Sequence, residues 1–364
     1  MNVRRPTIAD VARRAGVAPS TASVVFSGKS RVAEPTRARV LAAAAELGYT
    51  GPDPLAASLR RGRSGIVAVV LQGDIRRVFL DPVMTVVMDG LADAIAPLGA
   101  GILFLRADPV EGAEGVGPTL TTAPIDAAVL LTTNERHAAV DTLRARGIPV
   151  VAVEGDAGPG VPRIGLDNRE AQRQVASHLS SLGHTDVAIV TLPRGDAQPR
   201  PGWLDAAAER GITMPVTAER LAGARDVYPA ALAYASGQSL IDEGVRAGRA
   251  ILAAHRPTAV IAQSDLLAAG VVRAAEEAGL RVPDDLSVTG FDGVAVDGLA
   301  PYRLTTMAQP AADKGRAAGH VIAELLAGRP AASVRFTCVF REGNTTGPAR
   351  RTAPPTGTAA FAAR

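Results

Sequence analysis

The sequence of 364 residues contains a single cysteine, Cys338. An intramolecular disulfide needs two cysteines, so the sequence excludes one, and it also excludes a cysteine-rich metal site. The five histidines are dispersed and show no metal-ligand spacing. We therefore expect no metal ion and no other cofactor, and the scarcity of cysteine agrees with a reducing cytosol.

Long hydrophobic runs are also missing. No stretch reaches the ~20 consecutive apolar residues of a membrane-spanning helix, and the N-terminus lacks the apolar core of a secretory signal. Apolar residues make up 47% of the chain and charged residues 21%, a composition typical of globular proteins. We expect a cytoplasmic protein of two or three domains without membrane contact.

The sequence motifs of several common enzyme classes are absent. There is no Walker loop, no complete Gly-x-Gly-x-x-Gly after a strand, no Gly-x-Ser-x-Gly elbow and no His-Glu-x-x-His. An α/β fold hosts enzymes and binding proteins alike, so the residues of the functional site, and not the fold, distinguish the two classes. These absences argue against an enzyme.

Charge is distributed unevenly along the chain. Residues 1–63 contain 11 basic and four acidic side chains, whereas the remaining 301 residues contain 28 basic and 32 acidic ones. This asymmetry favours an N-terminal segment that meets a polyanion. A solvated basic surface is the alternative that the charge alone leaves open.

Residues 7–28, TIADVARRAGVAPSTASVVFSG, carry two short helical patterns. Thr7 and Asp10 have the spacing of a capping box, which predicts a helix start at Thr7. Gly16 permits the left-handed backbone that ends this helix, and Pro19 suits the first turn of a second one that runs to about Phe26. One stripe of the first helix is apolar: Ile8, Val11, Ala12 and Ala15.

A third helix is predicted from about Glu34 to Leu47, where Gly48 ends it. Its inward side chains are expected to be Val40, Leu41, Ala44 and Leu47. Two short helices joined by a tight turn with glycine form a helix-turn-helix unit, whose second helix enters the major groove of DNA. The sequence therefore predicts an all-α DNA-binding domain over residues 1–50.

The second helix is expected to turn Ala22, Val25 and Phe26 towards the core. Its outward side then presents small side chains that let the backbone approach the bases: Pro19, Ser20, Thr21, Ser23 and Val24. Solvated helix positions are the alternative for Ser20, Thr21 and Ser23.

Two further residues of this region are candidate DNA contacts. Thr7 is a helix cap that is open to an additional phosphate contact. Lys29 follows the second helix and is the other candidate.

Residues 51–64 are rich in proline and glycine and are predicted to form a linker with a short helix at 55–59. So short a helix is not stable alone in water, so a partner must fold it. A DNA duplex is such a partner if Leu59 wedges into a minor-groove step and the following arginines, beginning with Arg60, meet phosphates. Ordinary packing of Leu59 within a dimer is the alternative.

From Ile66 onwards, apolar strands alternate with amphipathic helices, and the alternation starts again near residue 187. This order indicates βαβ units and parallel sheets that are buried on both faces. We predict two α/β subdomains in tandem, each a doubly wound parallel sheet, over residues 65–345. Residues 346–364 are rich in Thr, Pro and Ala without periodicity and are predicted to be a disordered tail.

Over residues 6–345 the sequence resembles the lactose-repressor/galactose-repressor (LacI/GalR) family of bacterial transcription regulators. The resemblance rests on TIADVARRAGVAPSTAS and TRARVLAAAAELGY near the start. Further along it rests on IPVVAVEG, VPRIGLDN, HLSSLGHTDVAIVT, AVIAQSDLLAAGVVRAAEEAGLRVPDDLSVTGFDG and PYRLTTMAQP. The order and spacing of these segments together make the resemblance specific.

The resemblance implies a cytoplasmic bacterial repressor that joins the nucleoid when it binds DNA. It implies a homodimer or a tetramer that reads a palindromic double-stranded operator, with hinge helices paired in the minor groove. It further implies a periplasmic-binding-protein-like sensor that closes on a small-molecule effector, such as a sugar or a related metabolite. Ligand occupancy then changes DNA affinity by ~5- to 150-fold.

The sequence departs from the family at two positions of the helix-turn-helix. Val24 stands where the family usually has an arginine, and Ala18 stands where it often has a serine cap. The first change removes a strong donor to guanine or phosphate, and the loss of a cap costs ~1 kcal/mol. We therefore expect an operator that differs from the commonest family sequence.

Candidate ligand-binding residues follow the predicted strands of the sensor: Phe79, Asp167, Arg200, Trp203, Asp265 and Asp292. Asp265 opens a helix at the carboxyl end of a strand, where α/β proteins bind ligands, and its alternative role is a helix cap. Packing is the alternative for the two aromatic residues. The resemblance places Arg200 near the family's ligand-clamping arginine, but one residue closer to Gly202–Trp203 than usual.

Two aspartates have open roles as well. Asp167, with Asn168, is expected either to cap the following helix or to line the rim of the pocket. Asp292 is expected either at the hinge between lobes or at the ligand.

Overall fold

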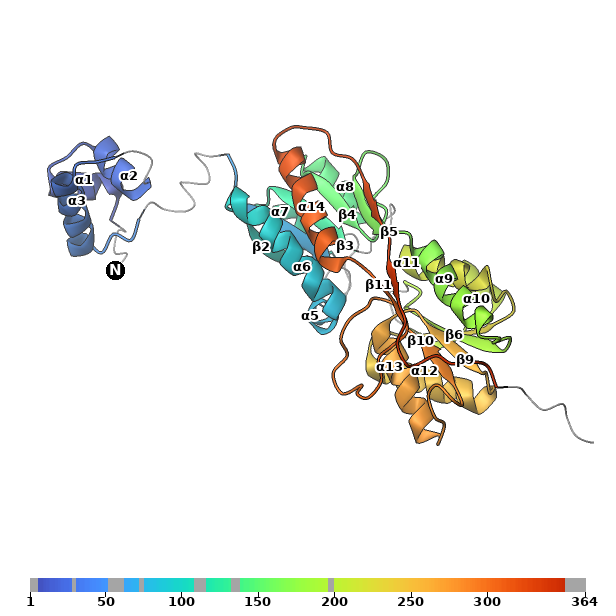
Figure 1. Ribbon diagram of the computed structural model, residues 1–364. Coiled ribbons are helices and arrows are strands. Elements are labelled where there is room, and N and C mark those ends of the chain that lie inside the picture. The colour runs from blue at the N-terminus through green and yellow to red at the C-terminus, as the bar shows by residue number, and fades with distance from the viewer. Residues whose placement is uncertain are drawn as a thin grey trace, which may run out of the picture. The chain divides into compact units, whose positions relative to one another are not determined.

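The computed structural model describes residues 6–27, 31–51, 62–71, 75–107, 116–131, 138–195 and 200–350. The chain divides into two compact units, residues 1–65 and 66–364 (Figure 1). Within the described ranges, none of the helices is both long and apolar enough to cross a membrane.

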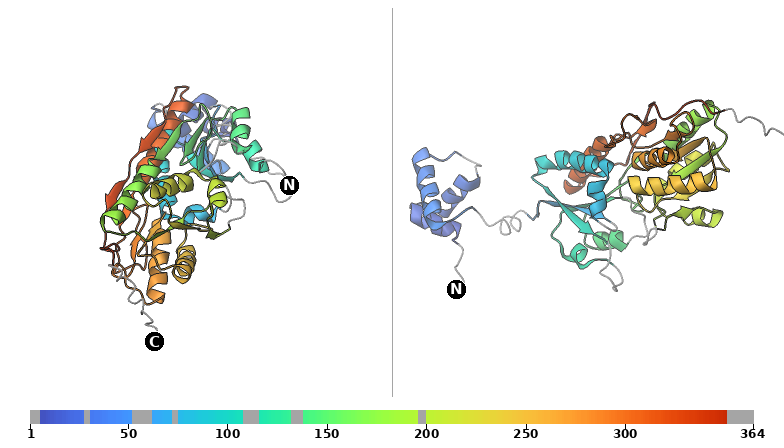
Figure 2. Two further views of the ribbon diagram at one scale, coloured as in Figure 1. Left: turned by 90° about the vertical axis from the view of Figure 1, so that its right-hand side faces the viewer. Right: turned by 90° about the horizontal axis from the view of Figure 1, so that it is seen from below.

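The first unit contains three helices, α1 (Ile8–Ala15), α2 (Pro19–Ser27) and α3 (Glu34–Leu47), which pack around one apolar core (Figure 2). The predicted capping box is present, because the Thr7 side chain accepts from the Asp10 amide and the Asp10 side chain accepts from the Thr7 amide. Gly16 and Gly48 end α1 and α3 in the left-handed conformation. The helix boundaries predicted from these local signals are confirmed.

The inward face of α3 differs from the prediction at one position. Val40, Ala43 and Ala44 are buried, whereas Leu41 is 43% exposed. A helix turns ~100° per residue, so Leu41 cannot share the stripe of Val40 and Ala44. The prediction that Leu41 packs inward was wrong, and Ala43 takes its place.

The second unit contains two parallel sheets. The first has the strand order β12-β5-β4-β3-β1-β2, and all of its pairs are parallel. Its strands are β1 (Ile66–Leu71), β2 (Gly101–Arg106), β3 (Ala127–Leu131), β4 (Val150–Val153), β5 (Arg163–Leu166) and β12 (Val334–Phe336). Alternate side chains of β1 enter different apolar clusters on the two faces, as expected for a sheet that is covered on both sides.

Helices cover both faces of this first sheet. α6 (Pro82–Ile95) and α14 (Ala311–Leu326) pack on one face, and α7 (Pro118–Thr122) and α8 (Ala138–Ala145) pack on the other. The short α5 (Arg76–Leu80) precedes α6, and the 3-10 turn η1 (Ala96–Leu98) follows it.

The second sheet has the order β10-β9-β6-β8-β7, and only the edge strand β7 is antiparallel to its neighbour. Its strands are β6 (Val187–Thr191), β7 (Gly202–Trp203), β8 (Leu232–Ala235), β9 (Ala259–Ala262) and β10 (Ser287–Thr289). α12 (Ile241–Ala254) and α13 (Asp265–Glu277) cover one face, and α9 (Asn168–Ser181) and α11 (Pro215–Arg225) cover the other. The short α10 (Ala206–Arg210) follows β7.

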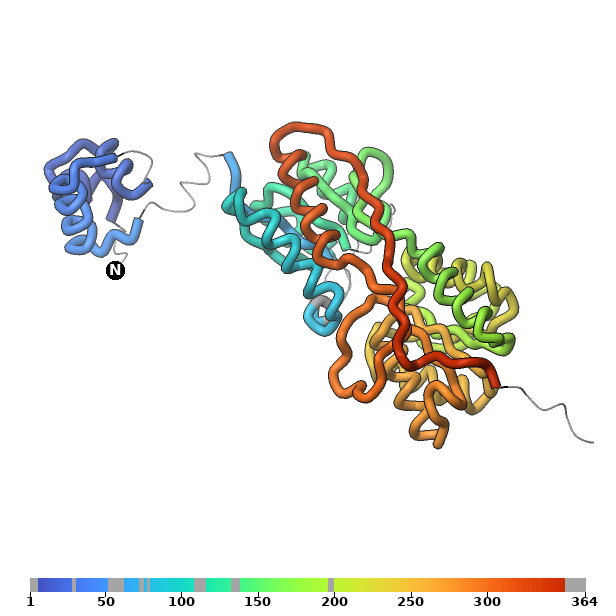
Figure 3. The backbone as a smooth tube through the Cα atoms, viewed as in Figure 1, coloured from blue at the N-terminus to red at the C-terminus, as the bar shows by residue number. Residues whose placement is uncertain are grey.

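The two subdomains are not arranged strictly in tandem, which corrects the sequence prediction. After β11 (Thr306–Ala308) the chain returns to the first subdomain, where α14 packs on α6 and β12 pairs with β5. It then forms β13 (Val339–Arg341), which pairs with β11 (Figure 3). Gly90 and Gly315 allow α6 and α14 to meet closely, because a side chain at either position would collide with the other helix's backbone.

The region predicted to be a tail begins with residues that contact the second subdomain. The Thr346 hydroxyl lies 3.0 Å from His178 Nε2, and the Gly347 carbonyl lies 3.0 Å from His184 Nε2. The hydrogen bonds of residues 346–350 therefore correct the expected start of the tail. Residues 351–364 and the predicted linker helix at 55–59 lie outside the described residues.

Candidate nucleic-acid interface and junction ring

The outward face of α2 is small and uncharged. Pro19, Ser20 and Ser23 are exposed, and Thr21 and Val24 are half-buried. The inward residues Ala22 and Val25 are buried, as predicted. No residue of α2 carries a charge, so this face offers hydroxyl and methyl groups to a ligand rather than ionic ones.

Exposed basic residues lie on α1 of the same unit. Arg13 and Arg14 lie in the last turn of α1, and their side chains are 78% and 59% exposed. Arg13 pairs with Asp10 at 3.2 Å, and Arg14 pairs with Glu46 at 2.5 Å. Exposed pairs of this kind are weak, so a polyanion can compete for both arginines.

Of the other predicted DNA-contact residues, the structure describes only Thr7. The Thr7 hydroxyl donates to Asp10 Oδ2 at 2.7 Å, so its capping role is observed and its phosphate contact stays a prediction. Lys29, Leu59 and Arg60 lie outside the described residues, so their proposed contacts also stay predictions.

Six polar side chains form a closed ring of hydrogen bonds where the subdomains meet, which we call the junction ring. Glu154 follows β4, and Lys314 lies on α14 of the first subdomain. Asn168 begins α9, and Arg220 lies on α11 of the second. The remaining two members, Asp292 and Gln309, follow β10 and β11.

The bonds of the junction ring can be followed around it. Lys314 Nζ donates to Glu154 Oε1 at 2.7 Å, and Asn168 Nδ2 donates to Glu154 Oε2 at 3.0 Å. Arg220 Nε donates to Asn168 Oδ1 at 2.9 Å, and Arg220 Nη1 lies 3.4 Å from Asp292 Oδ1. Gln309 donates to Asp292 Oδ1 at 2.6 Å and accepts from Lys314, which closes the ring.

Burial makes these charges interdependent. Only 3% of Arg220, 1% of Lys314 and 7% of Glu154 are exposed. An unpaired charge at such a depth is costly, so Lys314 needs the Glu154 carboxylate in place. The Arg220 guanidinium also lies over the ring of Phe291, 3.5 Å from its centroid, and donates to the Gln263 carbonyl at 2.5 Å.

The sequence analysis missed Arg220, Lys314, Glu154 and Gln309. Lys314 carried a signal, because it is one of two lysines in a chain of 39 basic residues. Arg220 also carried one, since it falls on the inward stripe of α11 beside Val216 and Leu221. Their partners lie far away along the chain, so neither signal identified the ring.

Two further carboxyl groups, those of Asp265 and Asp81, lie near Asp292 of the ring. Burial, together with the nearby carboxylates of Asp265 and Asp81, raises the pKa of Asp292 to about 8 against the lowering effect of Arg220. Burial likewise raises the pKa of Asp265 to about 6. It also raises the pKa of Asp81, which caps α6 by accepting from the Val83 amide at 2.9 Å.

The structure separates the predicted ligand-binding residues. Asp265 and Asp292 lie near each other, and only Asp292 belongs to the junction ring. Asp265 accepts from the Thr306 hydroxyl at 2.6 Å and from the Val294 amide at 2.8 Å, while Ser264 caps α13. Both oxygens of Asp265 thus have partners within the protein, which favours a structural role in holding the segments of Val294 and Thr306 together.

The remaining candidates lie outside the ring. Phe79 is 65% exposed and meets Phe104 edge-on, and Trp203 is 43% exposed and meets Tyr234 edge-on. Arg200 is exposed. Asp167 does not cap α9 with its side chain, and it lies 3.3 Å from Arg335. Ligand contacts by these residues stay predictions.

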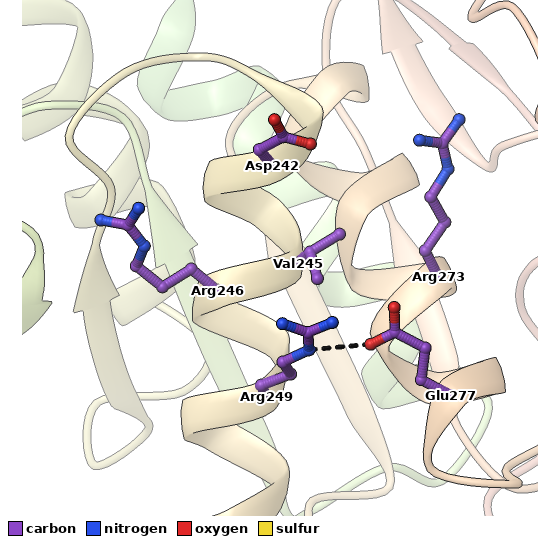
Figure 4. Close-up of a pocket in the computed structure, with 6 residues that line it drawn as sticks. All are labelled: Asp242, Val245, Arg246, Arg249, Arg273 and Glu277. Atoms are coloured by element: carbon purple, nitrogen blue, oxygen red, sulfur yellow. Dashed lines mark hydrogen bonds and ion pairs between the residues drawn. The ribbon is translucent and has the colours of Figure 1, made fainter.

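A groove of about 450 Å³ lies between α12 and α13, away from the ring. Val245 lies between its two ends, and the ion pair of Arg249 and Glu277 at 2.8 Å closes one end (Figure 4). At the other end stand Asp242 and Arg273, and neither has a hydrogen-bond or ion-pair partner in the part of the chain that the structure describes. Arg246 also lines the groove and pairs with Glu243 at 3.3 Å.

Comparisons with known proteins match both units. Residues 7–51 match the model of the lacI family of bacterial regulatory proteins, and residues 176–345 match that of the periplasmic binding protein-like domain. The sequence is 32% identical to an HTH-type transcriptional regulator of Mycolicibacterium smegmatis over 361 residues, which cover 95% of this chain and 97% of that protein.

Two solved structures extend these matches. A complex of the transcriptional regulator CelR with cellobiose is 26% identical, with a TM-score of 0.66 over 94% of this chain and 100% of that one. The lac repressor dimer bound to operator and the anti-inducer ONPF is 22% identical, with a TM-score of 0.74 over 94% of this chain and 100% of that one. The second likeness shows a shared fold.

Proposed function

Because the chain belongs to the lacI family of HTH-type transcriptional regulators, we propose that it represses transcription as a dimer on a palindromic operator, under the control of a small-molecule effector. The predicted family resemblance and fold class are confirmed, as is the expectation of a regulator rather than an enzyme. The repressor role, the dimer and the effector belong to the proposal.

The exposed, uncharged face of α2, together with the exposed arginines of α1, supports the DNA-binding part of the proposal. A helix held this way after a tight turn can present Ser20 and Ser23 to base edges in the major groove. Arg13 and Arg14 are available for phosphates, which supply most of the affinity without reading sequence. The remaining predicted contacts, including Leu59 and Arg60 in the linker, complete the proposed interface.

The junction ring supports control by an effector bound between the two lobes. The bonds Asn168–Glu154 and Lys314–Gln309 cross the subdomain junction, so a rotation of one lobe against the other must stretch or break them. A ligand that binds one arrangement more tightly shifts the protein towards it. We propose a saccharide, because CelR, a 26% identical regulator, was solved with cellobiose, and because the carboxyl group of Asp292 can form hydrogen bonds with hydroxyl groups in either protonation state.

We assign the α12–α13 face to the second copy of the chain. Twofold dimers bring the same patch of both copies together, so such a patch must be complementary to itself. This face carries a carboxylate, Asp242, and a guanidinium, Arg273, that have no partner among the described residues. Each is placed to meet its opposite in the other copy.

Two experiments on the full chain test the proposal. Selection from a random double-stranded DNA library is expected to yield one palindromic consensus, and the absence of any consensus would refute specific DNA binding. A thermal-shift screen of mono- and disaccharides, beginning with cellobiose, is expected to identify a sugar that raises the melting temperature, because a ligand of the folded state stabilises it. The same sugar is expected to change the affinity for the operator. A sugar that binds without changing this affinity would refute the proposed control by an effector.

A further inference from the structure

We propose that α2 reads its operator through thymine methyl groups and that Val24 is the residue that determines this specificity. The inference rests on the proposed DNA-binding function and deepens it. It concerns which chemical groups of the base pairs the helix recognises, and it follows from the groups that α2 has available.

The side chains of α2 exclude the strong forms of base readout. Bidentate recognition of guanine requires Arg or Lys, that of adenine requires Asn or Gln, and cytosine is read by Asp or Glu. The nine residues of α2, PSTASVVFS, include none of these types. Serine and threonine hydroxyls both donate and accept, so Ser20 and Ser23 bond to any base with little discrimination.

Among the described residues, Val24 is the residue of α2 with two side-chain methyl groups that lies outside the domain's apolar cluster. Its neighbour Val25 is 7% exposed and belongs to the apolar cluster of the three helices, whereas Val24 is half-buried and does not belong to it. Val24 lies one turn after the exposed Ser20 and next to the exposed Ser23, so it shares their face. A β-branched side chain in a helix has one strongly preferred rotamer, so both Val24 methyls are held in place.

The major-groove edges of the four bases carry one apolar group, the C5-methyl of thymine. A valine on the recognition face therefore gains by contact with thymine and by desolvation of its own methyls. It gains nothing from the polar edges of guanine, adenine or cytosine. The chemistry of α2 accordingly favours an operator half-site with thymine opposite Val24.

The test uses the operator that the full chain selects from random DNA. Each thymine of the half-site is replaced in turn by deoxyuridine, which removes the methyl and keeps every hydrogen-bonding group. At one thymine we expect a loss of affinity of about fourfold per half-site, the value of one buried carbon, and about 15-fold when both half-sites are changed. Restoring the methyl with 5-methylcytosine in the corresponding cytosine-substituted operator should recover part of the loss.

The residue is tested by a double-mutant cycle. Val24→Ala is expected to weaken binding to the thymine operator. The variant should then bind the thymine and deoxyuridine operators with almost equal affinity, so that discrimination between them disappears. Val24→Thr keeps the branched shape and one methyl, and should retain part of the discrimination even if Val24→Ala folds poorly. Leu41→Ala changes an apolar side chain of α3 that is 43% exposed, and should leave the discrimination intact.

The outcomes separate the two proposals. If no consensus operator is selected, the DNA-binding function itself fails. If an operator is selected but no deoxyuridine substitution weakens binding, thymine readout is refuted. Undiminished discrimination by folded Val24→Ala would refute the role of Val24 alone.

Discussion

Lys314 and Glu154 form an ion pair in which both side chains are almost completely withdrawn from water. Moving both charges out of water costs several kcal/mol per ion, so the pair is a poor source of stability compared with apolar residues of the same size. The pair contributes more to fixing the positions of these side chains than to stability. Each charge fixes the place of the other, and the bonds to Asn168 and Gln309 extend this constraint across the subdomain junction.

We predict that Lys314→Met lowers the free energy of unfolding by about 3–5 kcal/mol, because it leaves Glu154 buried without its cation. Urea unfolding monitored by circular dichroism measures this change. Arg316→Met on the same helix is the matched control, since Arg316 pairs with Asp313 at the surface and its loss should cost less than about 1 kcal/mol. Equal effects of both substitutions would contradict the assigned role of the buried pair.

The raised pKa of Asp292 predicts how stability depends on pH. That pKa is about 8 in the folded protein, against about 3.9 in the unfolded chain. Between these values the folded protein keeps a proton that the unfolded chain has released. The free energy of unfolding should therefore fall as the pH rises towards about 8 and then level off.

Asp292→Asn should flatten this decline, chiefly between about pH 6 and 8 because Asp265 remains and titrates at about 6. Urea unfolding at several pH values measures the slope. Asp297→Asn, a change at an exposed position in the same loop, is the control and should leave the slope as in the wild type. A wild-type slope in Asp292→Asn would refute the assignment.

At the scale of the element, local signals predicted more than distant ones. Thr7, Gly16 and Pro19 fix the ends of α1 and α2 through contacts within a few residues, so the sequence was sufficient there. The apolar run of β1 was also sufficient, because a strand buried on both faces needs little else. β12 was not predictable, since its three residues are ordered by pairing with β5 about 170 positions away.

The same distinction between local and distant signals explains which residues of the junction ring could be predicted from the sequence. Asp292 follows a recognisable strand and was found, whereas Arg220 and Lys314 are meaningful only through partners 72 and 160 positions away. A single sequence does not reveal which of its 39 basic residues will meet a buried carboxylate. The helix faces followed from periodicity, but the misplacement of Leu41 shows the limit of that argument for a helix rich in alanine.

The caps of the helix-turn-helix predict two changes of opposite sign. Thr7→Ala removes the observed cap of α1 and should destabilise the three-helix unit by about 1 kcal/mol. Ala18→Ser adds a side-chain oxygen before α2, where the Ala18 carbonyl already accepts from the Ala22 amide, and should stabilise the unit by a similar amount. Amide hydrogen exchange of α1 and α2 in the full chain measures both, and Thr50→Ala outside the helices should change neither.

At the scale of the whole molecule, one chain links a lacI-family DNA-binding unit to a second unit whose two lobes share a polar junction. The return of α14 and β12 to the first subdomain means that several chain segments pass between the lobes. Such connections permit a rotation between two arrangements while keeping each lobe intact. In the proposed dimer, the two DNA-binding units belong to one twofold assembly, which matches the symmetry of the proposed palindromic operator.

The proposed dimer face predicts the effect of charge reversal. Asp242→Arg and Arg273→Asp should each weaken self-association by about tenfold or more, because like charges then oppose each other across the interface. The double variant should recover much of the loss. Sedimentation velocity measures the dimer fraction, and Asp141→Arg on the surface of α8 is the control. Independent, additive losses in the double variant would contradict the pairing.

The most direct test of the central claim is the affinity for the selected operator as a function of salt, measured for the full chain and for a variant that lacks residues 1–60. The full chain should lose affinity linearly on a logarithmic salt scale, because arginines displace counterions from the phosphates. The shortened variant should bind no operator and still bind the sugar found by thermal shift. Operator affinity retained by the shortened variant would contradict the account.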